Sequence, residues 1–245
     1  MIAFIPARAG SKRIPGKNLR ALDFGVPLIA YTITAAIESQ CFEAIYVCTD
    51  DARCAAIATH LGVAVIDRDP VPDDQADIVW VKAAIRRCAP WPEAFAILRP
   101  TSPFRTAAII QDAVRQFQGR HEVDSLRALT RVSEHPGKMW TITKGQARPV
   151  IDQTIGLVPW HSAPTQTLPP YYKQTGGLEL VWTRTIFDTG TISGTRILPF
   201  LIDGPAALDL NTDADWQRAE ALATATPALL PRVDLARLSA VPQIS

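Results

Sequence analysis

The chain has 245 residues, 47% of them hydrophobic, and a formal net charge of only +1 at pH 7. This length suits one large α/β domain or a domain with a modest insertion, and the near-neutral charge argues against a nucleic-acid partner. No apolar run reaches the ~18–20 residues that span a bilayer, and the first six residues lack the apolar segment of a signal peptide. We therefore expect a cytoplasmic protein without a membrane partner. The four cysteines have neither C-x-x-C nor metal-ligand spacing, which argues against a cysteine-based metal site.

The most strongly charged loop follows the first expected strand, Ile2 to Ile5. Five of the 25 Lys and Arg residues lie within thirteen positions: Arg8, Lys12, Arg13, Lys17 and Arg20. Gly10 and Gly16 allow backbone N–H groups to turn inward and form an anion nest, and Arg and Lys side chains suit phosphate. We expect a polyphosphate cradle; the alternative is a solvated basic surface loop. The glycine spacing matches neither a Walker A loop nor G-x-G-x-x-G.

The string IPARAGSKRIPGKN, residues 5–18, resembles the signature of the CMP-acylneuraminate synthetases, cytidylyltransferases that activate acidic nine-carbon sugars with CTP. It resembles the CMP-KDO synthetases less, because their loop lacks the Lys17-Asn18 pair. The resemblance implies that the CTP site is formed by Ala7, Arg8, Ser11, Lys12, Lys17 and Asn18. Within that set, Arg8 and Lys17 are implied to act in catalysis.

The next expected elements are a helix from Leu28 to Ser39 and a short buried strand from Ala44 to Cys48. Polar residues directly after a buried strand lie at the carboxyl edge of a sheet, where open α/β folds bind ligands. We favour Asp50 as the N-cap of the following helix, Ala52 to His60. The resemblance implies instead that this segment borders the active site.

A third strand is expected from Val63 to Ile66, and an acidic segment then leads into a helix from Ile78 to Arg87. The family carries an Arg and an Asp before this helix, and both border the cytidine site. Arg68 and Asp73 are the nearest matches here, and the match requires a gap in the spacing. They are added to the implied nucleotide-binding residues.

A strand from Ala94 to Leu98 is followed by RPTSPFR, residues 99–105, which resembles the family string LQPTSPLR. A plain turn with Ser102 as a helix cap would explain the hydroxyls but not the whole string. The resemblance implies a sugar subsite at Arg99, Thr101 and Ser102, in which Arg99 replaces a Gln that contacts the sugar. A helix over 106–117 and a strand over 123–129 continue the alternation of strands and helices. This alternation predicts a doubly wound, mainly parallel sheet.

Six prolines interrupt residues 134–172, and no regular hydrophobic period replaces them. A segment of this length is not expected to be a free loop. The resemblance implies an inserted arm that embraces the second subunit of a homodimer; the alternative is a lid packed on its own chain. After it, Lys173 and Gln174 are implied to bind the sugar. Lys173 stands in place of a carboxylate-binding Arg and Thr165 in place of a second one, and Arg99 could supply the missing charge.

The last motif is ALDLNTDAD, residues 207–215. Thr212 is expected to cap a helix that runs to about Ala225, with Asp213 and Asp215 in its first turn. The resemblance implies a Mg²⁺ site on Asp209, the main and catalytic ligand, and on Asn211, which replaces a family Asp. Mg²⁺ accepts an amide oxygen with less charge attraction than a carboxylate. Residues 226–245 are expected to form a loosely attached tail.

We therefore expect one cytidylyltransferase domain over residues 1–225, with the insertion at 134–172. It would join CTP to an acidic nonulosonic sugar and release pyrophosphate. Two alternatives stay open: a nucleotidyltransferase for another sugar or base, and a non-catalytic nucleotide-binding or assembly protein.

Overall fold

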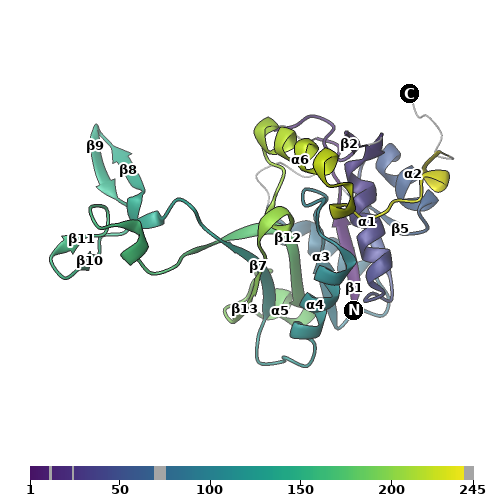
Figure 1. Ribbon diagram of the computed structural model, residues 1–245. Coiled ribbons are helices and arrows are strands. Elements are labelled where there is room, and N and C mark those ends of the chain that lie inside the picture. Colours follow the sequence, from purple (N-terminus) through teal and green to yellow (C-terminus); the bar gives the residue numbers. More distant parts are fainter. Residues whose placement is uncertain (11–12, 24, 69–75, 240–245) are drawn as a thin grey trace. The chain divides into compact units, whose positions relative to one another are not determined.

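The computed structural model describes residues 1–10, 13–23, 25–68 and 76–239. The chain divides into two compact units, residues 1–128 with 175–245 and residues 129–174 (Figure 1). In the described part of the chain, no helix is long and apolar enough to cross a membrane.

A seven-stranded sheet has the order β13-β7-β12-β6-β1-β4-β5. Its strands are β1 (Ile2–Pro6), β4 (Ile45–Thr49), β5 (Ala64–Asp67), β6 (Ala94–Ile97), β7 (Ser125–Arg131), β12 (Tyr172–Trp182) and β13 (Ile197–Leu201). Strand β1 pairs in parallel with β4 and β6, β4 pairs in parallel with β5, and β12 runs antiparallel to β6. The chain goes from β1 to β4 and β5 on one side and then crosses back to β6 on the other. The strand order therefore reverses beside β1, which is where doubly wound sheets bind ligands.

Both faces of this sheet are covered, as the predicted doubly wound fold requires. The helices are α1 (Leu28–Ser39), α2 (Ala52–His60), α3 (Ile78–Arg86), α4 (Ala107–Phe117), α5 (Thr183–Asp188), α6 (Asp213–Ala225) and α7 (Leu235–Ser239). On β1, Ala3 and Ile5 belong to the apolar cluster shared with α1, α2, α4 and α6, whereas Ile2 and Phe4 belong to the cluster shared with α3 and α5. Alternate residues of a strand point to opposite faces, so a continuous apolar strand fills two cores.

Side chains cap the starts of α2, α4 and α6, with one difference from the sequence analysis. Asp51, not Asp50, is the N-cap of α2, and its carboxylate accepts a hydrogen bond from Arg53 N at 2.9 Å. Thr106 caps α4. Thr212 caps α6 in a capping box with Asp215, as its sequence pattern predicts. Because Asp51 already caps α2, the carboxylate of Asp50 can accept a hydrogen bond from another segment.

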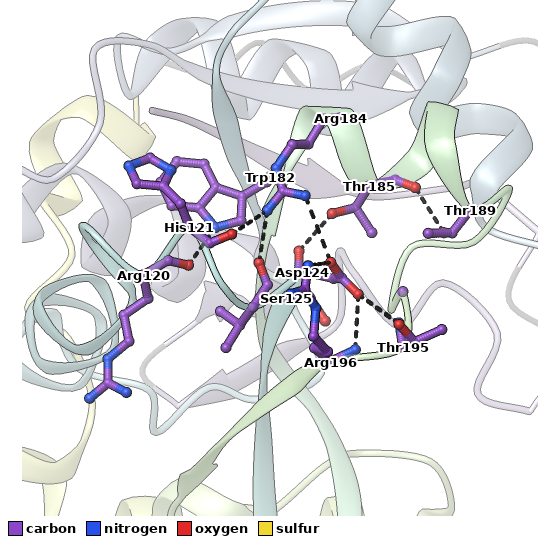
Figure 2. A network of polar contacts seen from close by, with 12 residues as sticks. Arg120, His121, Asp124, Ser125, Trp182, Arg184, Thr185, Thr189, Thr195 and Arg196 are labelled. Carbon is purple, nitrogen blue, oxygen red and sulfur yellow. Dashed lines mark hydrogen bonds and ion pairs between the residues drawn. The ribbon is translucent and has the colours of Figure 1, made fainter.

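Asp124 links three segments at the sheet edge opposite to the carboxyl ends of the parallel strands (Figure 2). Its Oδ2 accepts hydrogen bonds from Thr195 N at 2.8 Å and Arg196 N at 2.9 Å. The backbone carbonyl of Asp124 accepts from Thr185 Oγ1 at 2.8 Å. The hydrogen bonds from Arg196 and Thr195 lower the pKa of Asp124 to about 2, so the carboxylate is charged at neutral pH.

Residues 129–174 form two antiparallel hairpins and two short 3₁₀ turns. The strands are β8 (Trp140–Thr143), β9 (Gln146–Pro149), β10 (Thr154–Ile155) and β11 (Val158–Pro159), and the turns are η1 (Pro136–Lys138) and η2 (Thr165–Thr167). Trp160 is only 6% exposed and packs with Ala163 and Leu168 in a small apolar cluster, with Tyr171 packed against it. The role predicted for 134–172 in a homodimer stays a prediction.

The C-terminal segment differs from the expected loose tail. A 3₁₀ turn, η4 (Pro227–Leu229), leads to Leu230, which is buried in the core shared with α1 and α6. Val233 and Leu238 are partly buried against the same core. Residues 227–239 are therefore docked by apolar contacts, although the polar residues between them conceal the pattern in the sequence. The short strands β2 (Ala21–Asp23) and β3 (Val26–Pro27) pair with each other before α1. The 3₁₀ turn η3 (Gly204–Ala207) lies before α6.

Candidate active site

The candidate site lies at the carboxyl edge of the parallel strands, beside the switch point at β1. The segments after β1 and β4 are joined there. Ala9 N donates to Asp50 Oδ1 at 2.7 Å, and Thr49 Oγ1 donates to the carbonyl of Ala7. Asp50 thus holds the cationic loop instead of capping α2, while the implied position of this segment next to the site stays a prediction.

The cationic loop is held in a defined turn. Gly16 has a φ of +63°, a conformation that glycine adopts without steric penalty, whereas Gly10 has no positive φ. Ile14 is fully buried and anchors the loop in the core. Asn18 Nδ2 donates to the carbonyl of Arg8 at 3.2 Å, which ties the two ends of the loop together. The implied contacts of Ser11 and Lys12 lie outside the described residues.

Lys17 connects this loop to two other segments of the site. Its side chain is buried, and Nζ donates to the carbonyl of Leu210 at 2.8 Å. Leu210 N in turn donates to the carbonyl of Thr101 at 2.8 Å. Burial lowers the pKa of Lys17, and repulsion from Arg13 and Arg8 lowers it further. The attraction of Asp209 acts in the opposite direction and raises it. The ammonium is thus fixed between the predicted phosphate loop and the predicted metal ligands.

Asp209 and Asn211 are in direct contact, because Asn211 Nδ2 donates to Asp209 Oδ2 at 2.8 Å. The other oxygen of Asp209, Oδ1, is buried and has no hydrogen-bond partner within the described residues. A buried carboxylate oxygen without a partner suits a hard cation such as Mg²⁺. Nowhere in the described residues, this site included, does a group of three or more His, Cys, Asp or Glu side chains lie close enough to hold a metal ion. The donor set therefore fits Mg²⁺ held by few protein ligands together with phosphate oxygens.

Two glycines at the start of the core part of β12 leave room for this arrangement. A Cβ at Gly176 would lie 3.1 Å from Asp209 Oδ2, and a Cβ at Gly177 would lie 2.9 Å from Ser102 Oγ. Ser102 is buried, and its hydroxyl has no partner among the described residues. The β12 backbone thus passes between the predicted metal ligand and a predicted sugar-binding hydroxyl.

Arg99 also lies in this site, but it is already paired. Its guanidinium contacts Glu179 through Nη1, and Nη2 donates to Asp77 Oδ2 at 2.6 Å. Burial opposes the charge, but the carboxylates of Glu179 and Asp77 outweigh it and raise the pKa of Arg99. Sequence reasoning missed Glu179 and Asp77, and also Arg127, which lies 2.9 Å from Glu179. Only the fold brings residues so far apart in the sequence together.

Arg68 follows β5, and its guanidinium lies over the Trp80 ring at 5.1 Å. Burial lowers the pKa of Arg68, while Asp77 acts in the opposite direction. The second implied cytidine residue, Asp73, lies outside the described residues. The acidic residue directly before α3 is Asp77, whose Oδ1 accepts from Trp80 Nε1 at 2.8 Å.

The remaining predicted sugar ligands belong to the other unit. Lys173 and Gln174 are exposed and open β12, and they lie in residues 129–174. Thr165 begins η2 in the same unit. Their contribution to the site stays a prediction.

At the switch point of this doubly wound sheet, the Lys17 ammonium lies within electrostatic reach of Arg8 and of the carboxylate of Asp209. Such an arrangement of charges is suited to nucleotidyl transfer. The comparisons agree with that class. Residues 2–138, more than half of the chain, match the family model described as cytidylyltransferase, and the chain belongs to this family. The prediction of the family is confirmed.

Two curated relatives cover most of the chain. It is 30% identical over 233 residues to the CMP-N,N'-diacetyllegionaminic acid synthase of Legionella pneumophila, covering 91% of this chain and 95% of that protein. It is 30% identical over 223 residues to the N-acylneuraminate cytidylyltransferase of Escherichia coli, covering 89% of this chain. The chain spans about half (51%) of the length of the E. coli protein.

Two solved structures share the fold. The structure of CMP:2-keto-3-deoxy-manno-octonic acid synthetase complexed with CTP has a TM-score of 0.64 and 16% identity, over 91% of this chain and 98% of that one. The 4-diphosphocytidyl-2C-methyl-D-erythritol synthase of Anaerococcus prevotii has a TM-score of 0.61 and 8% identity over the same shares. These similarities confirm the α/β fold class and carry no further conclusion about the site.

Proposed function

We propose that this chain transfers CMP from CTP to the anomeric hydroxyl of an acidic nonulosonic sugar and releases pyrophosphate. The observation that carries the proposal is the chain of contacts from Lys17 through Leu210 to Thr101. It brings together the loop that would hold phosphates, the segment that would hold the metal and the turn that would hold the sugar. The names of the relatives support CTP and a sialic-acid-like sugar as substrates.

The reaction needs one bond to form and one to break. The anomeric oxygen bonds to the α-phosphorus, and the bond from this phosphorus to the oxygen bridging the β-phosphate breaks. Pyrophosphate leaves with the bonding electrons, and the hydroxyl proton is lost to solvent. Arg8 and Lys17 would neutralise the charge that shifts onto the leaving group, which is where phosphoryl-type transfers gain most of their acceleration.

Asp209, with the amide oxygen of Asn211, would hold Mg²⁺ in this site. When bound, the ion would neutralise phosphate oxygens and orient the triphosphate. Lys17 keeps the 209–211 backbone in place through its hydrogen bond to the Leu210 carbonyl. Thr101 and Ser102 would bind sugar hydroxyls from the turn after β6.

We also infer that the protein acts in the cytoplasm as a homodimer. In residues 129–174, several large apolar side chains are exposed: Met139, Trp140, Ile142, Leu157 and Val158. Leu157 is 99% exposed. Apolar groups gathered on one small unit support contact with another protein surface, and a second copy of this unit is the partner that the family resemblance implies.

The test is pyrophosphate release with each of the four nucleoside triphosphates against a panel of acidic sugars, including N-acetylneuraminic acid and N,N'-diacetyllegionaminic acid. We expect release with CTP and at least one sugar, and none from Asp209→Ala. Equal release with all four nucleotides would contradict the base assignment. No release with any combination would favour a nucleotide-binding protein without catalysis.

A further inference from the structure

Four side chains form a row of alternating charge across the sheet and onto α3. In order they are Arg127 on β7, Glu179 on β12, Arg99 after β6 and Asp77 before α3. Arg127 Nη2 lies 2.9 Å from Glu179 Oε2, Glu179 Oε1 contacts Arg99 Nη1, and Arg99 Nη2 lies 2.6 Å from Asp77 Oδ2. Strands β7, β12 and β6 are neighbours in the sheet. The row carries two positive and two negative charges.

The two ends of the row differ in burial. Glu179 shares its face of β12 with Val181, which packs in the α3 cluster, and its side chain is 1% exposed. Arg127 is also buried. A carboxylate this deep cannot lose one of its arginines without leaving a poorly solvated charge. The inner end of the row is therefore fixed, and it holds the Arg99 guanidinium in one orientation.

The outer end is open to water. The Asp77 side chain is 43% exposed, and its Oδ1 is held separately by Trp80 Nε1. Ion pairs that water can reach contribute little net free energy. The contact between Arg99 and Asp77 is thus the one in the row that another carboxylate can replace, and Arg99 then still has two carboxylate partners.

We propose that the carboxylate of the acidic sugar displaces Asp77 from Arg99, so that Arg99 is a specificity-determining residue and Asp77 its built-in competitor. This inference rests on the proposed function. The planar guanidinium suits a carboxylate, and Arg99 is two residues from Thr101 in the turn that would hold the sugar. Glu179 and Arg127 are positioning residues, because they act on the sugar only through Arg99.

The experiment measures KM for the sugar and for CTP in wild type, Asp77→Asn and Arg99→Gln. Asparagine keeps an oxygen for Trp80 but does not attract Arg99, so Asp77→Asn should lower the sugar KM about two- to fivefold. Arg99→Gln should raise it about tenfold or more. In both variants the KM for CTP should change less than the KM for the sugar. In the Arg99→Gln background, Asp77→Asn should have no effect, and turnover of the methyl ester of the sugar carboxylate should not respond to Asp77→Asn.

Asp112→Asn is the matched control, because Asp112 is also 43% exposed and also pairs with an arginine, Arg115, at 2.8 Å. It should change neither KM. An unchanged or raised sugar KM in Asp77→Asn, or a drop that persists without Arg99, overturns the inference while the enzyme still turns over. A wild-type protein that releases no pyrophosphate with any sugar removes the proposed function, and this inference with it.

Discussion

At the scale of single residues, Lys17 has two functions that the sequence could not separate. A loop lysine suggests a solvent-edged phosphate contact whose loss leaves the fold intact. In the structure Lys17 is 8% exposed, and its Nζ donates to the Leu210 carbonyl. Its removal therefore takes away a structural bond as well as a cation.

We expect Lys17→Ala to lower kcat/KM for CTP about a hundredfold or more, since a positioned charge is lost. It should also lower the free energy of unfolding by about 1–3 kcal/mol, because a buried carbonyl loses its donor. Arg13→Ala is the control in the same loop, because Arg13 is exposed; it should leave stability unchanged. Steady-state kinetics and urea unfolding check both effects. Unchanged kcat/KM for CTP in Lys17→Ala would remove Lys17 from the site.

Asn211 gives a second residue-scale prediction. Its amide now bonds to Asp209 Oδ2 at 2.8 Å, and an aspartate there would place two carboxylates side by side. We expect Asn211→Asp to lower the Mg²⁺ concentration for half-maximal rate, because a second carboxylate would then bind the ion. Without Mg²⁺ the same pair repels, so the melting temperature should become more dependent on Mg²⁺ than in wild type. Melting curves with and without Mg²⁺ give a readout apart from turnover, and identical Mg²⁺ responses would contradict the assignment of Asn211.

The site residues that the sequence predicts lie in recognisable motifs. The residues that it misses are those that pair with them in the folded chain. Arg99 stands out within RPTSPFR. The orientation of its guanidinium, however, is set by Glu179 and Asp77, which belong to no motif. Asp50 was favoured as a cap because any Asp before a helix suits that role. Its neighbour Asp51 fits equally well on sequence. Only the structure separates the two, because Asp51 accepts from Arg53 N and Asp50 accepts from Ala9 N.

At the scale of elements, the start of α6 decides whether Asp215 is a metal ligand or a cap. Asp215 Oδ2 accepts hydrogen bonds from Asn211 N at 3.0 Å and from Thr212 N and Oγ1 at 2.8 Å. Because these hydrogen bonds cap α6, Oδ2 of Asp215 is not available to bind a metal ion. We expect Asp215→Ala to lower the free energy of unfolding by about 0.5–2 kcal/mol. Its Mg²⁺ dependence should stay close to that of wild type, whereas Asp209→Ala should abolish turnover.

Chemical unfolding and a Mg²⁺ titration of the two variants check this. If Asp215→Ala lost turnover as completely as Asp209→Ala, with unchanged stability, Asp215 would be the metal ligand.

The elements themselves were the most predictable part of the fold. The alternation of apolar strands with amphipathic helices reflects local geometry, and the central strands and helices lie within a few residues of the expected ranges. Elements that depend on tertiary contact were not predictable. Leu230, Val233 and Leu238 hold the C-terminal segment only because α1, α2 and α6 already form a surface for them. Trp160, a large apolar residue of the inserted segment, is buried in the cluster of its own unit.

At the scale of the whole molecule, Asp124 is a pH-sensitive contact that links segments far apart in sequence (Figure 2). Its folded-state pKa of about 2 lies below the ordinary value, so its stabilisation is complete above about pH 5 and is lost as the pH falls toward 2. Asp124→Asn should reduce the free energy of unfolding at neutral pH by about 1–3 kcal/mol. This difference should shrink between about pH 4 and about pH 3. Urea unfolding across this range tests it, and a difference independent of pH would contradict it.

The homodimer is also a whole-molecule prediction. Light scattering at micromolar concentration should give twice the chain mass of 26.7 kDa. Replacing exposed apolar residues of the 129–174 unit, as in Leu157→Asp, should shift the mass toward the monomer. Val79→Asp, at an exposed apolar side chain of α3, is the matched control and should leave it unchanged. A wild-type mass of one chain would contradict the dimer.

The most direct measurement follows the α-phosphate itself. CTP labelled at the α-phosphorus is incubated with the wild-type protein, Mg²⁺ and each acidic sugar, and the labelled products are separated and weighed by mass spectrometry. We expect the label in a species whose mass is that of CMP joined to the sugar, with unlabelled pyrophosphate formed in equal amount. Label that stays in CTP, or that is released as free CMP in the presence of every sugar, would contradict the assignment of this chain as a sugar cytidylyltransferase.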